Sequence, residues 1–157
     1  MKLDIATLYI VSLLTTAFAG GIFLYTWRQN PVQRSVAWWG VSMLMSSAGS
    51  FVLATEGVLL PPLAAHLVGN AAIILSYGIL WSAARMFEHR EPRWLFGLAG
   101  TGLWFAACAL PGFADTVTAS GIYTVVVLAI YVFAASWEIG RTRRSASATT
   151  CRSRPAS

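Results

Sequence analysis

The residues that could carry chemistry are few in this sequence, and most of them follow one another in a single segment. The candidates for a ligand or signalling site are His66, Asn70, Tyr77, Trp81 and Arg85. On a helix the first four fall within one arc of roughly 60°, and Arg85 continues the stripe. Such a face could bind a ligand or move against its neighbours. The simpler interpretation is packing, with Asn70 and Tyr77 forming interhelical hydrogen bonds of about 0.6 kcal/mol each.

Catalytic and metal-binding constellations are not evident. His66 and His89 are 23 positions apart, which is roughly 35 Å along a helix, so they cannot share a metal within one chain. The two cysteines, Cys108 and Cys151, stand in different contexts, and there is no paired acid, His-x-x-x-His motif or phosphate-binding glycine loop. The sequence therefore predicts no enzyme, no cofactor and no metal site.

Composition places these residues in a membrane protein. The chain has 157 residues, of which 57% are hydrophobic and 11% charged, whereas a soluble domain carries about a quarter charged residues. This excludes an ordinary soluble enzyme, a coiled coil and a disordered protein. The net charge of +5 would suggest nucleic acid as the partner of a soluble protein. Here the positions of the charges favour a lipid bilayer and no nucleic acid.

Five apolar segments meet or approach the length of about 20 residues that a membrane-spanning helix needs. They cover residues 5–27, 35–55, 63–84, 94–110 and 117–137. Their continuous apolar character favours helices over the alternating strands of a barrel. The sequence thus predicts an all-α, polytopic bundle of about five transmembrane helices in a membrane domain of residues 1–140.

The basic residues predict the orientation of this bundle. Ten of the eleven would lie on one side, and only Lys2 on the other. Because cytoplasmic loops hold the excess of Lys and Arg, we expect the N-terminus outside and the C-terminus in the cytoplasm. Residues 141–157 contain five arginines and no acid, so we expect a basic, disordered tail near the anionic leaflet.

Tryptophan is concentrated near the cytoplasmic edge that this orientation predicts. Amphipathic rings favour the level of the lipid headgroups, so these residues are expected to form an interfacial belt. The belt comprises Trp27, Trp38, Trp39, Trp94 and Trp137, with Trp81 close to it.

A cleaved signal peptide is the alternative for the first segment, since residues 17–20 (AFAG) resemble a cleavage site. Against it, the apolar run continues to Trp27 and Asp4 offsets Lys2. Cleavage would also place the arginines of the first two basic loops outside.

Small and charged residues predict some of the helix contacts. Ala17 with Gly21 in the first span, and the glycines of residues 97–102 in the fourth, should let helices approach closely. Glu138 stands near Arg141 at the inner end of the fifth span, and we expect the two to form an ion pair at the interface.

Short motifs in a fixed order carry a family resemblance over roughly the first 140 residues. They are residues 3–9 (LDIATLY), 27–31 (WRQNP), 37–40 (AWWG), Asn70, 76–81 (SYGILW), 84–87 (ARMF) and 92–94 (PRW). Together they resemble the multi-pass N-terminal region that precedes a GGDEF domain in proteobacterial diguanylate cyclases.

The resemblance implies a sensory or anchoring input module of cyclic di-GMP signalling in the bacterial inner membrane. Full-length members condense two GTP into cyclic di-GMP, usually as dimers. This sequence contains no GGDEF motif, so no GTP or magnesium site is carried over. We expect a module that is truncated or acts through a partner, either as a homodimer or with a separate cytoplasmic signalling protein. The alternative is a small transporter or channel subunit, for which Asn70 would be the polar midplane residue.

Overall fold

The computed structural model describes residues 5–110 and 117–152, with side chains described for residues 7–110 and 119–140. This part of the chain is all-helical, as predicted. The five helices are α1 (Ile5–Gln29), α2 (Arg34–Ala54), α3 (Pro62–Phe87), α4 (Trp94–Cys108) and α5 (Val117–Arg152). Each begins within one residue of the predicted segment. Pro62 stands at the first position of α3, where the missing N–H removes no helical hydrogen bond.

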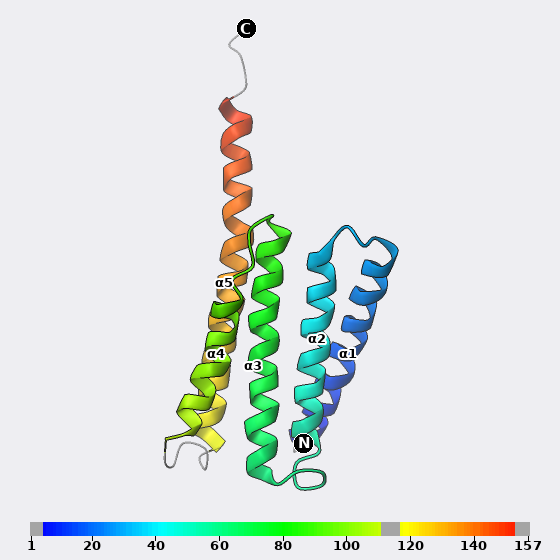
Figure 1. Ribbon diagram of the computed structural model, residues 1–157, viewed down its shortest axis with the longest axis vertical. Helices are drawn as coiled ribbons and strands as arrows, with labels where there is room; N and C mark the ends of the chain where they lie inside the picture. The colour runs from blue at the N-terminus through cyan, green and yellow to red at the C-terminus, as the bar shows by residue number, and fades with distance from the viewer. Residues whose placement is uncertain (1–4, 111–116, 153–157) are drawn as a thin grey trace.

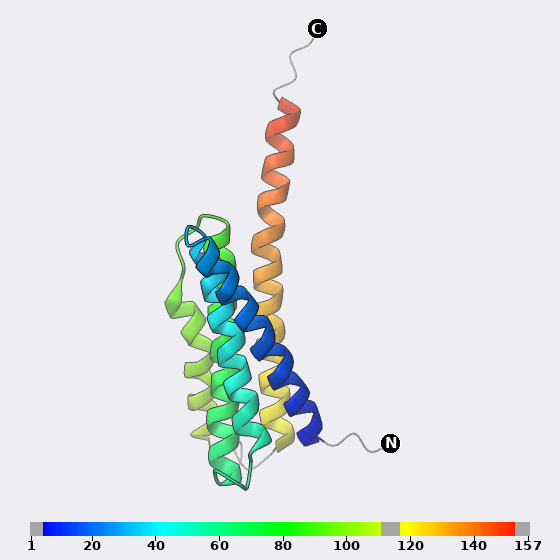
Figure 2. The same ribbon diagram turned by 90° about the vertical axis from the view of Figure 1, so that its right-hand side faces the viewer.

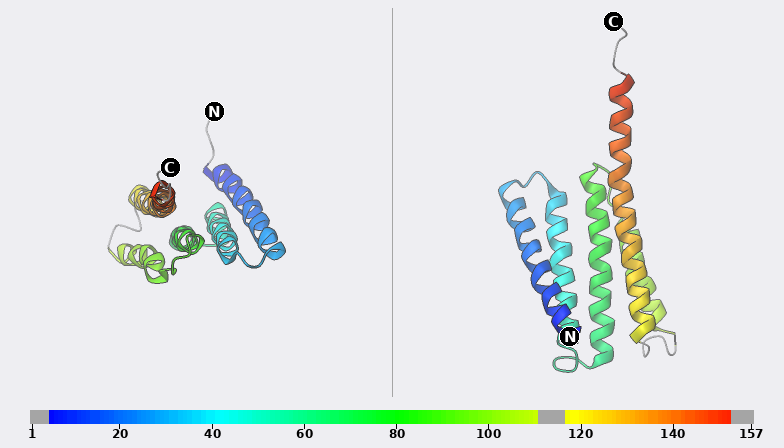
Figure 3. Two further views of the ribbon diagram at one scale, coloured as in Figure 1. Left: turned by 90° about the horizontal axis from the view of Figure 1, so that it is seen from above. Right: turned by 180° about the vertical axis from the view of Figure 1, so that it is seen from behind.

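Successive helices run antiparallel and form an open arc (Figures 1 and 3). The order across the arc is α1, α2, α3, and then α4 and α5 side by side. The central helix is α3, which packs against α2, α4 and α5. The loops that follow α1 and α3 lie at the end where the C-terminal half of α5 projects (Figure 1). We call this the arginine-rich end, because Arg28, Arg34, Arg85, Arg90 and Arg93 stand there.

Burial in the bundle is inverted relative to a soluble protein. Serine side chains such as Ser76 and Ser82 are 2% and 0% exposed, whereas Phe18 and Leu95 are 75% and 83% exposed. Apolar solvent gives helices no hydrophobic reason to bury large side chains, so small residues fill the contacts and large apolar residues face outward. The surface is therefore compatible with contact to a lipid bilayer.

Each of the first three helix pairs packs through one glycine from either helix. The pairs are Gly20 with Gly40, Gly49 with Gly69, and Gly78 with Gly97. A Cβ atom at Gly49 would lie 2.8 Å from the carbonyl oxygen of Gly69, and one at Gly78 would overlap the backbone of Gly97. The backbones approach this closely only because both members of a pair lack a side chain.

The first two glycine pairs share a reciprocal arrangement. At the crossing of α1 and α2, Leu24 covers Gly40 and Leu44 covers Gly20. Each leucine stands four residues after the glycine of its own helix, so both helices contribute a glycine and a leucine at the same spacing. Gly20, and not the expected Gly21, makes the contact, because a Cβ atom added at Gly21 would meet no atom within 4 Å. Small residues alone did not reveal which face of the helix is used.

Four of the helices are long and apolar enough to cross a membrane. The qualifying stretches are Thr7–Gln29, Arg34–Ala54, Pro62–Phe87 and Ala119–Gly140. Helix α4 is shorter, with 15 residues, or about 22 Å at the α-helical rise. That length is below the hydrocarbon thickness of roughly 30 Å. The multi-pass character predicted from the sequence is thus supported by four helices, while α4 differs from them.

Helix α5 is longer than the predicted span. It has 36 residues and ends at Arg152, so residues 141–152 continue as helix where the sequence predicted a disordered tail. A physical reason is that the apolar span provides the costly nucleus, after which each Arg, Ala or Ser residue extends the helix at little cost. The rest of the predicted tail, residues 153–157, lies outside the described residues.

Candidate functional site

The five residues predicted to share one face of α3 do not form a single cluster, although Trp81 and Arg85 contact each other. His66 lies near the end opposite the arginine-rich end, where its Nε2 atom is 3.3 Å from Oε2 of Glu56 in the loop before α3. The loop turns at Gly57, whose φ is 75°, a conformation that glycine adopts without steric cost. His66 and Arg85 are 19 positions apart, or roughly 28 Å. They cannot form one ligand site within the chain.

Asn70 and Tyr77 do not form the expected interhelical hydrogen bonds. Among the described residues, neither side chain has a hydrogen-bond partner. Tyr77 packs beside the core residue Ile74 and lines a small cavity of about 60 Å³ together with Ser42 and Thr16. The prediction failed because other polar groups provide the interhelical bonds.

The interhelical hydrogen bonds come from serine, tryptophan and tyrosine side chains. Ser47 on α2 donates to the carbonyl oxygen of Leu13 on α1 over 3.1 Å. Trp104 on α4 donates from Nε1 to the carbonyl oxygen of Leu67 on α3, also over 3.1 Å. Trp104 is 1% exposed, so its N–H would be costly to leave unpaired. The sequence could not identify these bonds, because their acceptors are backbone groups.

Tyr131 on α5 makes the most elaborate of these contacts. Its hydroxyl accepts a hydrogen bond from the backbone N–H of Gly100 (3.0 Å) and lies 2.9 Å and 3.0 Å from the carbonyl oxygens of Phe96 and Gly97. A Cβ atom at position 100 would lie 2.7 Å from the hydroxyl oxygen. The absence of a side chain at Gly100 therefore lets α5 bond directly to the backbone of α4.

An ion-pair cluster joins α3 to α5 at the arginine-rich end. Nη1 of Arg85 donates to Oε1 of the Glu138 carboxylate (2.5 Å), and Nη1 of Arg90 donates to its Oε2 (2.9 Å). The Arg85 and Glu138 side chains are only 11% and 12% exposed, whereas Arg90 is 40% exposed. Charge-assisted bonds of this length are the stronger kind, and removing one partner would leave a desolvated charge. We call Arg85, Arg90 and Glu138 the ion-pair cluster.

Arg85 is fixed from two further directions. Its Nε donates to the carbonyl oxygen of Glu91 over 3.2 Å, and its guanidinium carbon lies 5.4 Å from the centroid of Trp81. Trp81 in turn packs against the rings of Phe96 and Tyr131, each with a centroid distance of 6.5 Å. The predicted neighbours Trp81 and Arg85 thus do belong together, in a layer that contacts both α4 and α5.

The end of α3 brings Arg90 back toward Glu138. Helix α3 ends at Phe87. The N–H of His89 then donates to the carbonyl oxygen of Met86 (3.1 Å), and the N–H of Arg90 donates to that of Arg85 (3.0 Å). This is the Schellman pattern, which requires a left-handed residue, usually glycine. Here His89 has a φ of 55°, at a cost of about 1 kcal/mol.

The sequence missed the role of Glu138. The predicted partner Arg141 lies outside the residues whose side chains are described, and the described partners are Arg85 and Arg90, which are 53 and 48 residues away. A contact at such separation leaves no periodic signal in the chain. The only available indication was that a single carboxylate stands at the end of an apolar segment, where an isolated charge is unfavourable.

The predicted tryptophan belt gathers at the arginine-rich end, and its members also pack the helices together. Trp38 on α2 lies 4.8 Å, centroid to centroid, from Trp94 on α4. Trp39 stacks on Phe87 of α3 at 5.8 Å and meets Phe23 of α1 at 5.9 Å. Trp137 is 56% exposed and is stacked on Phe133 of its own helix. The belt therefore combines exposed rings with rings that bridge helices.

Comparison with known protein families, curated proteins and solved structures finds no match to this chain. The fold and the site together define an all-helical protein with four helices able to cross a membrane. Among the residues whose structure is described, no three His, Cys, Asp or Glu side chains are grouped as a metal site would require. The main polar feature among these residues is the ion-pair cluster, which connects α5 to the end of α3.

Proposed function

We propose that this chain is a membrane-embedded input module that passes a change in the bundle to its last helix, α5. The observation that carries the proposal is the position of the ion-pair cluster. Glu138 of the cluster contacts Arg85 near the end of α3, and α5 continues unbroken beyond Glu138 to Arg152, so that its C-terminal part projects past the other helices (Figures 1 and 2). A continuous helix transmits displacement or rotation, and a two-state contact at its base supplies the discrete change that such a device needs.

The cellular setting follows from the resemblance to the membrane regions of GGDEF diguanylate cyclases. The module would lie in the bacterial inner membrane, with its N-terminus outside and the arginine-rich end in the cytoplasm. The antiparallel arrangement supports this orientation, because it gathers at one end the arginines in and beside the loops that follow α1 and α3. Helix α5 would then deliver the signal to a cyclase-type partner, within a homodimer or on a separate cytoplasmic protein.

In this arrangement α4 would also cross the membrane, in addition to the four longer helices. Its 15 residues are short for a bilayer, but a short span is accommodated by local thinning at a modest cost per ångström. Three features tie it to its neighbours: the Gly78–Gly97 contact, the Trp104 bond to α3 and the Tyr131 bond to α4. An odd number of spans is needed to place the two ends of the chain on opposite sides.

Fusion of a GGDEF cyclase domain after Gly140 tests the proposal directly. The fusion retains Glu138 and should produce cyclic di-GMP in cells that lack other cyclases. Glu138→Gln should change this output at least several-fold, because Arg85 and Arg90 would lose their counter-charge and the contact between α3 and α5 would be destabilised. Glu91→Gln is the matched control, since Glu91 is an acid at the same end with no ion pair among the described residues.

The orientation is measured separately with reporters placed in the loops at residues 57 and 90 and after residue 140. The proposal expects residue 57 outside and the other two positions in the cytoplasm. An inserted fusion whose output is the same in wild type, Glu138→Gln and Glu91→Gln would refute coupling through the cluster. Reporters at residues 90 and 140 on opposite sides would refute the five-span arrangement.

A further inference from the structure

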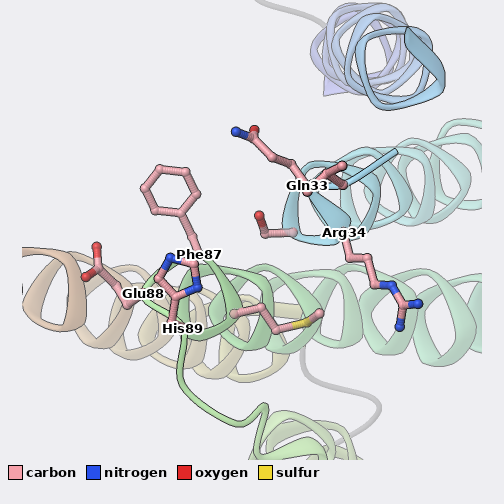
Figure 4. A pocket seen from close by; sticks show the side chains of 8 residues that line it. Gln33, Arg34, Phe87, Glu88 and His89 are labelled. Atoms are coloured by element: carbon pink, nitrogen blue, oxygen red, sulfur yellow. The ribbon is translucent and has the colours of Figure 1, made fainter. Parts of the chain in front are cut away.

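A cavity of about 640 Å³ opens at the arginine-rich end, between the start of α2 and the end of α3 (Figure 4). It is separate from the ion-pair cluster, and no member of that cluster lines it. Its polar lining consists of Gln33, Arg34, Ser35, Glu88 and His89. In Figure 4, Gln33 directly precedes α2 and Arg34 begins it. Phe87 is the last residue of α3, and Glu88 and His89 follow it.

The wall of the cavity that is formed by the start of α2 carries groups that favour an anion. Ser35 is 7% exposed, yet its hydroxyl and its backbone N–H have no hydrogen-bond partner among the described residues. The neighbouring N–H groups of Arg34 and Val36 donate to Val32 (3.2 Å) and Gln33 (3.1 Å). The free N–H therefore lies in the first turn of a 21-residue helix, where the helix dipole favours negative charge, and Arg34 adds a full positive charge.

The opposite wall carries a carboxylate. Glu88, which follows the last residue of α3, lines the cavity, and Figure 4 shows its carboxylate directed away from Arg34. Glu88 has no ion pair among the described residues, so each charge is available to a ligand. With His89 neutral, the formal charges of the lining cancel. A ligand that carries both a phosphate and an ammonium group would satisfy both walls, whereas a simple anion would satisfy Arg34 and be repelled by Glu88.

The position of the cavity indicates where such a ligand comes from. Phe87 forms part of the lining and stacks on Trp39 of the tryptophan belt, with 5.8 Å between ring centroids. Val32 and Met86 add apolar surface. Tryptophans of this kind lie at the level of the lipid headgroups, so the cavity would meet a headgroup and the first carbons below it.

We propose that the cavity binds the headgroup of an aminophospholipid such as phosphatidylethanolamine. The phosphate accepts hydrogen bonds from the Ser35 hydroxyl and N–H and pairs with Arg34, and the primary ammonium donates to Glu88. This inference rests on the membrane placement proposed above but not on the coupling through the ion-pair cluster. It assigns a lipid-binding site to a part of the bundle that the signalling proposal does not use.

Native mass spectrometry of the purified full chain in detergent tests the site. Phosphatidylethanolamine, phosphatidylglycerol and phosphatidylcholine with identical acyl chains are added in turn, together with soluble glycerophosphoethanolamine as a fourth probe. Phosphatidylethanolamine should bind best, because phosphatidylglycerol lacks the ammonium and phosphatidylcholine lacks its N–H donors. Glycerophosphoethanolamine should bind much more weakly, since it has no acyl chain to contact Val32 and Met86.

Three variants separate the contributions of the two walls. Arg34→Gln should weaken phosphatidylethanolamine binding by about tenfold, the usual value of one charge-assisted bond. Glu88→Gln should remove the preference for phosphatidylethanolamine over phosphatidylglycerol. Arg28→Gln is the control, because Arg28 is an exposed arginine in the last turn of α1 that does not line the cavity. Tryptophan fluorescence and gel filtration verify that each variant is folded.

Several results would overturn the proposal. Wild-type protein that binds phosphatidylglycerol as well as phosphatidylethanolamine would show an unselective basic surface. An equal loss in Arg28→Gln and Arg34→Gln would show the same. Tight binding of glycerophosphoethanolamine alone would identify a soluble ligand in place of a lipid. Loss of lipid preference in a chain that still has the expected orientation and Glu138-dependent output would remove this site and leave the proposed function intact.

Discussion

The layer of α1, α2 and α3 and the helix α5 are held in place by different means. The layer uses backbone-to-backbone contacts at the pairs Gly20–Gly40 and Gly49–Gly69. Helix α5 has no such contact at Gly121 or Gly140, where an added Cβ atom would meet no atom within 4 Å. It is attached through Tyr131 and Glu138, whose bonds are polar and directional. A glycine contact has one close-packed arrangement, whereas a few polar bonds can be exchanged for others. This difference is the reason why we propose α5 as the element that moves.

The largest effect should come from breaking a glycine contact. Gly78→Ala places a methyl group into the backbone of Gly97, which cannot yield as a flexible side chain would, so α3 and α4 must separate. We expect a loss of about 3 kcal/mol or more in the free energy of unfolding. Unfolding in mixed micelles of detergent and SDS, followed by tryptophan fluorescence, measures it. Gly102→Ala is the control, since it meets open space, and equal stability of the two variants would contradict the contact.

A smaller but still large effect is expected from Glu138→Gln. The change leaves Arg85, which is 11% exposed, without a counter-charge and should cost about 2 kcal/mol. Because the contact tethers α5, a spin label at position 137 should gain mobility in electron paramagnetic resonance spectra. Glu91→Gln should change neither quantity. A Glu138→Gln variant with wild-type stability and label mobility would show that the cluster does not hold α5.

Tyr131→Phe should have an intermediate effect. The ring is kept, but the hydroxyl that bonds to Gly100 is lost, and the expected cost is about 1 kcal/mol. The same fluorescence-detected unfolding experiment measures it. Tyr25→Phe serves as the control, because Tyr25 is 67% exposed and makes no hydrogen bond among the described residues. If the free energy of unfolding falls equally in the two variants, the hydrogen bond from Tyr131 to α4 makes no net contribution to stability.

The smallest effect should come from His89→Gly. Glycine adopts the left-handed conformation found at this position without strain, so relief of about 1 kcal/mol opposes the added entropy of the unfolded chain. We expect stability within about 0.5 kcal/mol of wild type. His89→Val should instead destabilise by more than about 1 kcal/mol, because a β-branched residue disfavours positive φ. A valine variant as stable as the glycine variant would exclude the Schellman geometry.

Some features of this protein could be predicted from its sequence because they depend on the chain alone. The positions of the five helices follow from the length of each apolar run and from the prolines and charges between runs, as at Pro31 and Pro92. The gathering of Arg28, Arg34, Arg85 and Arg93 at one end also follows, since antiparallel helices return every second loop to the same end. Neither property requires knowledge of which faces touch.

The site could be predicted only in part. The contact between Trp81 and Arg85 could be expected, because they stand four positions apart on one helix. Asn70, Tyr77 and His66 stay predicted site residues, since a common helical face does not say what lies opposite it. Glu138, Tyr131 and Ser35 acquire their importance from groups that are distant in the chain or belong to the backbone.

The amino-acid sequence by itself determined that the chain forms apolar helices and where each begins, because hydrophobicity and helix-breaking residues act locally. Only the tertiary structure decided that Gly20 and not Gly21 meets α2, that Glu138 pairs with Arg85 and Arg90, and that a polar cavity opens beside Ser35. The physical reason is that large apolar side chains are spread around these helices and not confined to one face. Hydrophobicity therefore does not select among lateral pairings, and close backbone contact together with a few polar bonds makes the choice.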